Sequence, residues 1–229
     1  IPRYAQYTCC TLTQNILKRV IDTIAKALSC IFYPLFMPTI GMVLLCHAYH
    51  TQIMPLAGIW IATAIGCTVL LSCILPLTAI WILMRRGSIT DIHISNAKQR
   101  TTPYLYSIVG FAFWAYMLIF TIKAPLCINV VAVGATIALI AVTIINYWWK
   151  ISAHLTGMGG LLGGILSYCL STQAIPTWGT LCTWLGCTLA LMYARLYLKA
   201  HSPTQVVAGW LLGLCCTLIP NIIIYYAIL

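Results

Sequence analysis

The chain contains almost no acidic residues: its 229 residues include only Asp22 and Asp91, and no Glu. Glycosidases with paired carboxylates, aspartic proteases and two-metal hydrolases all need clustered acids, so these enzyme classes are excluded. Charged residues of both signs make up 6% of the chain and hydrophobic residues 62%, whereas about a quarter of a soluble domain is charged. With a mean hydropathy of +0.98, the chain is predicted to be an integral membrane protein, and its length suits one domain.

Cysteine pairs with metal-binding spacing are also absent. The twelve cysteines are scattered, mostly inside apolar runs, and none stands in a Cys-x-x-Cys pair. Adjacent cysteines such as Cys9 and Cys10 have poor geometry for a disulfide or for a shared zinc ion. We therefore interpret the cysteines as small apolar packing residues.

Long apolar stretches, in contrast, are abundant. A membrane span needs roughly 20 such residues, and seven stretches qualify or nearly do: 31–49, 54–84, 104–122, 125–149, 156–171, 177–198 and 204–229. Ahead of them, residues 11–28 form an amphipathic pattern, with Val20 and Ile24 opposite Lys18 and Asp22, which is typical of a helix lying along the membrane surface. An extension of the first span is the alternative.

These patterns predict an all-α fold: a polytopic integral membrane helix bundle with six or seven transmembrane helices plus an N-terminal amphipathic helix. Residues 1–30 would be an interfacial segment, and residues 31–229 the transmembrane domain.

Three polar islands, residues 91–103, 150–154 and 194–205, interrupt the apolar sequence. Two predicted spans separate the first island from the second, and two more separate the second from the third, so all three islands meet on one side of the membrane. Every Lys and Arg except Lys123 falls on that side. By the positive-inside rule this side is cytoplasmic, and we expect the location to be a bacterial inner membrane.

The islands bring histidines and cations to one membrane surface: His93, His154 and His201 with Lys98, Arg100, Lys150, Arg195 and Lys199. Such a cluster fits an anion, most naturally a phosphate on a lipid. The alternative is the ordinary cationic decoration of a cytoplasmic face. The expected partners are a lipid phosphate substrate and membrane lipids, with no nucleic acid, and the sequence leaves the oligomeric state open.

Local patterns place two of the islands at helix starts. Ser152 precedes the Gly-rich fifth stretch and is a candidate N-cap, which would leave free N–H groups for an anion. The run Ser202-Pro203-Thr204-Gln205 has the form of a capping box with Pro at the first helical position, and it puts His201 at the mouth of the last helix.

The islands resemble the three motifs of the type 2 phosphatidic acid phosphatase superfamily, which includes vanadium haloperoxidases. That family's third motif is Ser-Arg, five residues, His, three residues, Asp; here Arg195, His201 and Gln205 stand at the Arg, His and Asp places. The second motif, Pro-Ser-Gly-His, matches Ile151-Ser152-Ala153-His154. In the first, Lys, six residues, Arg-Pro, Arg100 takes the Arg place and His93 the Lys place, and Lys98 is available as the missing ammonium.

The resemblance implies a mechanism. His201 would attack phosphorus and form a phosphohistidine, while His154 would protonate the leaving group and then activate water. The phosphoryl oxygens would be held by cations and donors from all three islands: Arg100, Arg195, Lys98, His93, Ser152 and the N–H of Ala153. No metal and no cofactor is needed, which agrees with the shortage of carboxylates.

Gln205 is the departure from the family that matters most. An amide can accept a hydrogen bond from Nδ1–H of His201, but it cannot offset a positive charge, and it can turn either way. The change from Asp to Asn in a serine protease triad lowers kcat roughly 10⁴-fold. The predicted function is metal-independent hydrolysis of a phosphomonoester or diphosphate on a membrane lipid. A catalytically decayed lipid-phosphate-binding protein and a lipid phosphotransferase are the alternatives, as is a Gln205 that only closes the capping box.

Overall fold

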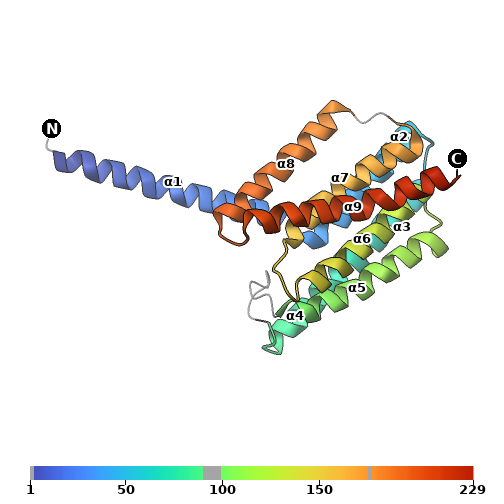
Figure 1. The fold of residues 1–229 in the computed structure, drawn as a ribbon, viewed down its shortest axis with the longest axis horizontal. Helices are drawn as coiled ribbons and strands as arrows, with labels where there is room; N and C mark the ends of the chain where they lie inside the picture. Colours follow the sequence, from blue (N-terminus) through green and yellow to red (C-terminus); the bar gives the residue numbers. More distant parts are fainter. Residues whose placement is uncertain (1–2, 90–98, 175–176, 229) are drawn as a thin grey trace.

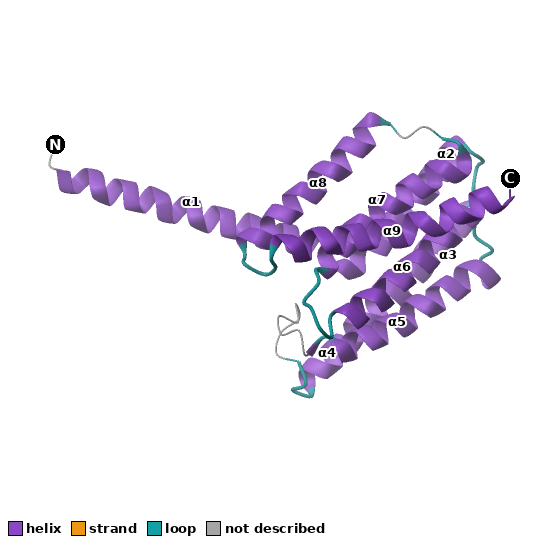
Figure 2. Ribbon diagram, in the orientation of Figure 1, coloured by secondary structure: helices purple, strands orange, loops and turns teal. Residues whose placement is uncertain are grey.

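The computed structural model describes residues 3–89, 99–174 and 177–228, and every regular element among them is helical (Figure 2). The predicted all-α class is therefore confirmed over the described ranges. The longer helices are α1 (Arg3–Ile31), α2 (Met37–Gln52), α3 (Gly58–Thr68), α4 (Leu75–Arg85), α5 (Thr101–Tyr116), α6 (Leu126–Ile145), α7 (Ala153–Thr172), α8 (Trp178–Tyr197) and α9 (Pro203–Ile228). Three short helices join or extend them: η1 (Pro34–Phe36), η2 (Val69–Ile74) and η4 (Met117–Thr121).

Five helical runs are long and apolar enough to cross a membrane: Gly58–Arg85, Thr101–Thr121, Leu126–Ile145, Ala153–Thr172 and Pro203–Ala227. The number is up to six if the pair Gln14–Ile31 and Pro34–Gln52, bent by 40°, forms one broken span. Among the described helices, α8 is outside this set, although residues 177–198 were predicted to span. The chain is thus a membrane protein by the length and composition of its helices.

Helix α7 lies at the centre of the bundle. It packs most extensively along α9 and also touches α2, α6 and α8. Figure 1 shows α1 projecting away from the bundle, with α8 leaning outward and meeting the end of α1. In the same view the starts of α5, α7 and α9 lie at one end of the bundle, where α8 finishes.

The glycines of α7 allow its close approach to α9. A Cβ on Gly159 would collide with the carbonyl of Trp210, and one on Gly163 would collide with the side chain of Thr217. Gly159 and Gly163 are four residues apart, the small-xxx-small spacing that predicts close helix contact, and the structure shows that contact. Asn221 adds an interhelical hydrogen bond, since its Nδ2 donates to the carbonyl of Ser167 at 2.7 Å.

Helix α1 is longer than the predicted amphipathic segment and ends at Ile31, ahead of the bend at η1. Its apolar residues Ile16, Val20 and Ile24 are each about half exposed in the isolated chain, at 61%, 48% and 54%. Ala25 and Ser29, on the face toward α8, are 3% exposed. The end of α1 is therefore part of the packed bundle.

Candidate functional site

One cavity collects side chains from all three polar islands. Its lining includes Arg100, His154, Arg195, His201 and the first residue of α7, Ala153. The volume of the cavity is about 70 Å³. We call this space the cationic cavity. Its described lining contains no Asp or Glu.

The residues that line the cavity lie at or next to the ends of helices. Arg100 is the N-cap of α5, Ala153 and His154 open α7, and Arg195 lies in the last turn of α8. His201 stands in the short connection between α8 and α9, two residues before Pro203 begins the last helix. Because each of these ends lies at the same end of the bundle (Figure 1), residues far apart in sequence share one wall.

His201 is held through its Nδ1 atom. Nδ1 lies 3.2 Å from the backbone carbonyl oxygen of Lys150 and 3.2 Å from Oε1 of Gln205. A carbonyl oxygen can only accept a hydrogen bond, so Nδ1 carries the proton. In the neutral ring the lone pair is then on Nε2, which is the atom that a nucleophilic histidine needs.

Gln205 both caps α9 and orients His201. Its Oε1 accepts from the backbone N–H of Ser202 at 3.2 Å, and its own backbone N–H donates to Oγ of Ser202 at 3.4 Å, which is the predicted capping box. The same Oε1 accepts from Nδ1 of His201. Since both neighbours are donors, the amide oxygen must face them, and the ambiguity expected for a glutamine at this position is removed.

The environment of His201 keeps its ring neutral. The side chain is 8% exposed. Burial together with the positive charges of Arg195 and Arg100 lowers its pKa to about 4, although the hydrogen bond that His201 donates to Gln205 acts in the opposite direction. A neutral imidazole retains its lone pair at neutral pH, which an attack on phosphorus requires.

Arg195 reaches the cavity from α8. Its Nη1 donates to Oγ of Ser29 at 3.2 Å, and its Nε is buried and has no hydrogen-bond partner among the described residues. Buried polar atoms are normally paired, so this donor is available for an anion.

His154 is held in the opposite manner, through Nε2. That atom lies 3.1 Å from the backbone carbonyl oxygen of Ser29, so it carries a proton. The ring also meets Tyr33 edge-on, with centroids 5.8 Å apart. Proton transfer from Nε2 to a leaving group requires the contact with Ser29 to open.

Ser29 is a site residue that the sequence did not indicate. Its carbonyl accepts from His154 and its hydroxyl accepts from Arg195, while the hydroxyl itself donates to the carbonyl of Ala25 at 2.9 Å. A serine near the end of an amphipathic helix carries no motif, and its two partners lie on α7 and α8, so no local signal identifies it.

Ser152 occupies the predicted N-cap position of α7, but the prediction that its side chain caps the helix is wrong. The side chain makes no capping hydrogen bond, and Oγ is buried without a partner in the described part of the chain. The residue is fully buried because the start of α7 packs against α9, where a Cβ on Gly209 would lie 2.6 Å from the Ser152 carbonyl oxygen. Ala153, not Ser152, lines the cavity.

Lys150 adds a third cation near the cavity. Burial and the charges of Arg100 and Arg195 lower the pKa of its ammonium group. The other predicted phosphate ligands, His93 and Lys98, lie outside the described residues. Over the described ranges, no group of three or more His, Cys, Asp or Glu side chains is placed to hold a metal ion.

Comparison of the chain with protein-family models, with curated proteins and with solved structures finds no match.

Proposed function

We propose that the protein hydrolyses a phosphomonoester or diphosphate on a membrane lipid, without a metal, through a phosphohistidine at His201. The observation that carries the proposal is the cationic cavity itself. Two histidines and two arginines from three separate parts of the chain line one space, and the ring of His201 is held with its Nε2 lone pair available.

The proposed reaction has two steps. Nε2 of His201 attacks phosphorus and the P–O bond to the lipid breaks. His154 enters this step protonated on both ring nitrogens, gives its Nε2 proton to the leaving oxygen and becomes neutral. Water then attacks the phosphohistidine, losing a proton to His154, the P–N bond breaks, and inorganic phosphate leaves. The second step returns the proton to His154 and frees Nε2 of His201, so the site is restored only after both steps.

The charge of the cavity fits a phosphoryl group in both steps. Arg100 and Arg195 line the space, and the unpartnered Nε of Arg195 supplies a buried donor. Burial, together with the charges of Arg100 and Arg195, lowers the pKa of Lys150, and a bound dianion would offset the repulsion among these cations.

A second function, binding of a lipid phosphate without turnover, is favoured by two features of the site. The Nε2 proton of His154 is directed at the Ser29 carbonyl, and the neutral Gln205 cannot stabilise an imidazolium ion. Both features slow catalysis while leaving the anion site intact.

We also propose how the helices and the cavity are arranged in the membrane. Six or seven helices span, with α8 as the additional span, and the exposed apolar face of α1 rests on the membrane surface. The cavity opens to the cytoplasm of a bacterial cell by the distribution of Lys and Arg. A single cysteine introduced at Ser88 would then resist a membrane-impermeant reagent applied outside the cell, and one at Gln173 would react; the reverse pattern would invert the orientation.

The proposed function is tested by phosphate release from a panel of lipid phosphates in detergent with EDTA: phosphatidic acid, phosphatidylglycerophosphate, polyprenyl phosphates and lipid A phosphates. We expect release from at least one of them, and a trapped phosphohistidine, stable to alkali and labile to acid, that is absent from His201→Ala. Binding of the same lipid without release would establish the second function. Release that depends on added zinc would contradict the proposal.

A further inference from the structure

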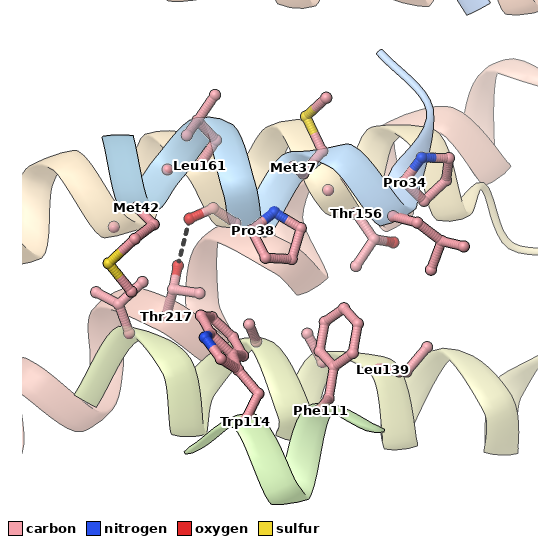
Figure 3. Close-up of a pocket in the computed structure, with 18 of the residues that line it drawn as sticks. Pro34, Met37, Pro38, Met42, Phe111, Trp114, Leu139, Thr156, Leu161 and Thr217 are labelled. Atoms are coloured by element: carbon pink, nitrogen blue, oxygen red, sulfur yellow. Dashed lines mark hydrogen bonds between the residues drawn. The ribbon is translucent and has the colours of Figure 1, made fainter. Parts of the chain in front are cut away.

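A second cavity, almost entirely apolar, adjoins the cationic cavity inside the bundle. It lies among α2, α5, α6 and α7, and its volume is about 110 Å³. Figure 3 shows Pro38 of α2 facing the rings of Phe111 and Trp114 of α5 across it. We call this space the apolar cavity.

The polar groups in the lining of the apolar cavity are already satisfied by the protein. Thr156 Oγ1 donates to the carbonyl of Ser152 at 3.0 Å, and Thr217 Oγ1 donates to the carbonyl of Gly160 at 3.1 Å (Figure 3). Nε1 of Trp114 donates to Oγ1 of Thr68 at 2.8 Å. A buried water needs two to four polar partners, whereas apolar cavities of about 150 Å³ stay dry and bind apolar molecules. This cavity therefore suits hydrocarbon.

The two cavities share part of their walls. Pro34, Leu35, Leu139 and Ala153 line both. One molecule with an anionic head and an apolar tail would thus meet cations at one end of these shared walls and hydrocarbon-like surface at the other.

We propose that the apolar cavity binds the hydrocarbon tail of the lipid whose phosphate lies in the cationic cavity. This inference rests on the proposed function and names the substrate class: a lipid phosphate recognised inside the bundle by a slender apolar chain as well as by its head. In the described conformation the space takes a tail segment about the size of benzene.

Glycines on α7 make room for the tail. Gly160 lines the cavity, and a Cβ there would find its nearest neighbour, Cγ2 of Thr217, at 3.7 Å, an ordinary contact. Gly160→Ala therefore adds a methyl group to the cavity without a collision. Ala135 of α6 also lines the cavity and is the site for a larger filling variant.

The kinetic test compares two alkyl phosphates with the same ester group, dodecyl phosphate and ethyl phosphate. Ala135→Leu should lower kcat/KM for dodecyl phosphate about tenfold, the order of effect of one or two misplaced methylenes in a hydrophobic pocket, and leave ethyl phosphate unchanged. Gly160→Ala should act in the same direction with a smaller effect. The matched control is Ala112→Leu, at an exposed alanine of α5, which should change neither substrate. Equal losses for both substrates would overturn the proposal.

A second measurement keeps the tail site testable if no substrate is hydrolysed. Dodecyl phosphate carrying a diazirine on its chain is photo-cross-linked to the wild-type protein, with and without excess inorganic phosphate. We expect adducts at cavity residues such as Met42 and Leu161, reduced by inorganic phosphate. Adducts confined to exposed positions such as Ile137 would overturn the tail site, whether or not phosphate is released. The release assay by itself decides only the proposed function.

Discussion

The two histidines of the cationic cavity are held by opposite ring nitrogens. His201 is held through Nδ1 by Gln205 and the Lys150 carbonyl, which leaves the Nε2 lone pair available. His154 is held through Nε2 by the Ser29 carbonyl, which places a proton there. A nucleophile needs a lone pair and a general acid needs a proton, so the difference in hydrogen bonding matches the different roles proposed for the two histidines.

The partners of the two histidines also differ in their origin. Gln205 is four residues from His201 and belongs to the same capping box. Ser29 is 125 residues from His154 and reaches it from α1. The proposed nucleophile, supported by its own capping box, should therefore respond to mutation differently from the proposed acid, which is supported by a remote helix.

The largest effect is expected for His201→Ala. Removing the nucleophile should lower kcat about 10⁴-fold or more, since a covalent mechanism has no substitute for it. Added imidazole should restore part of the activity by entering the vacated space. The control is His47→Ala, at an exposed histidine of α2, which should keep wild-type activity. Full activity of His201→Ala would remove the mechanism.

His154→Ala should cost less, about 10²- to 10⁴-fold, the range of general acid–base catalysis. For a substrate with a good leaving group, such as p-nitrophenyl phosphate, the first step needs no proton, so its rate should be close to that of the wild type. Hydrolysis of the phosphohistidine still needs His154, so the intermediate should accumulate and be visible after an alkaline quench. Absence of the intermediate would show that the two histidines do not have separate roles.

Gln205→Asp sharpens the comparison by placing a negative charge beside Nδ1 of His201. A carboxylate beside Nδ1 should raise the pKa of His201 from about 4, by about 1 to 3. Stabilisation of the imidazolium by the equivalent of one pKa unit would raise kcat about tenfold. The pH–rate profile checks this: the gain should be seen at higher pH and disappear in acid as His201 protonates. A loss at every pH would indicate a site built around the amide.

The stability of the protein should also depend on His201 in acid. Its folded-state pKa of about 4 is below the ordinary value of about 6.5. The unfolded chain therefore binds a proton that the folded chain excludes, and stability present above pH 6.5 is lost as the pH falls toward 4. Thermal melting in detergent should show a steeper decline over this window for wild type than for His201→Gln. Identical slopes would contradict the lowered pKa.

The smallest effect is expected for Ser29→Ala. The hydroxyl contact with Arg195 is lost while the carbonyl contact with His154 remains. KM should therefore rise about fivefold, the equivalent of a typical net hydrogen bond of about 1 kcal/mol, with little change in kcat. Ser29→Thr should restore the wild-type KM. Thr23→Ala is the matched control, since Thr23 makes the same kind of i−4 hydroxyl bond on the exposed part of α1. A fall in kcat alone would place Ser29 with His154 and not with Arg195.

The sequence predicted the parts of the molecule that depend on local patterns. The apolar stretches correspond to helices, the small-residue spacing of α7 corresponds to its contact with α9, and Ser202 and Gln205 form the expected capping box. It failed at Ser152, whose hydroxyl does not cap α7, because burial of that helix start against Gly209 outweighs the usual preference of an N-cap serine. α8 was predicted as a span and is less apolar than the five runs that qualify.

Composition together with the length of the apolar stretches predicted helices in a membrane. A chain with 6% charged residues cannot cover itself with water-facing side chains, and stretches of this length can satisfy their backbone within each span as helices. Only the tertiary structure decided which polar atoms of distant helices meet. The support of His154 and Arg195 by Ser29, and the shared walls of the cationic and apolar cavities, depend on how α1, α5, α7 and α8 end against one another. Contacts between distant helix ends have no periodicity in the sequence, so packing alone sets them.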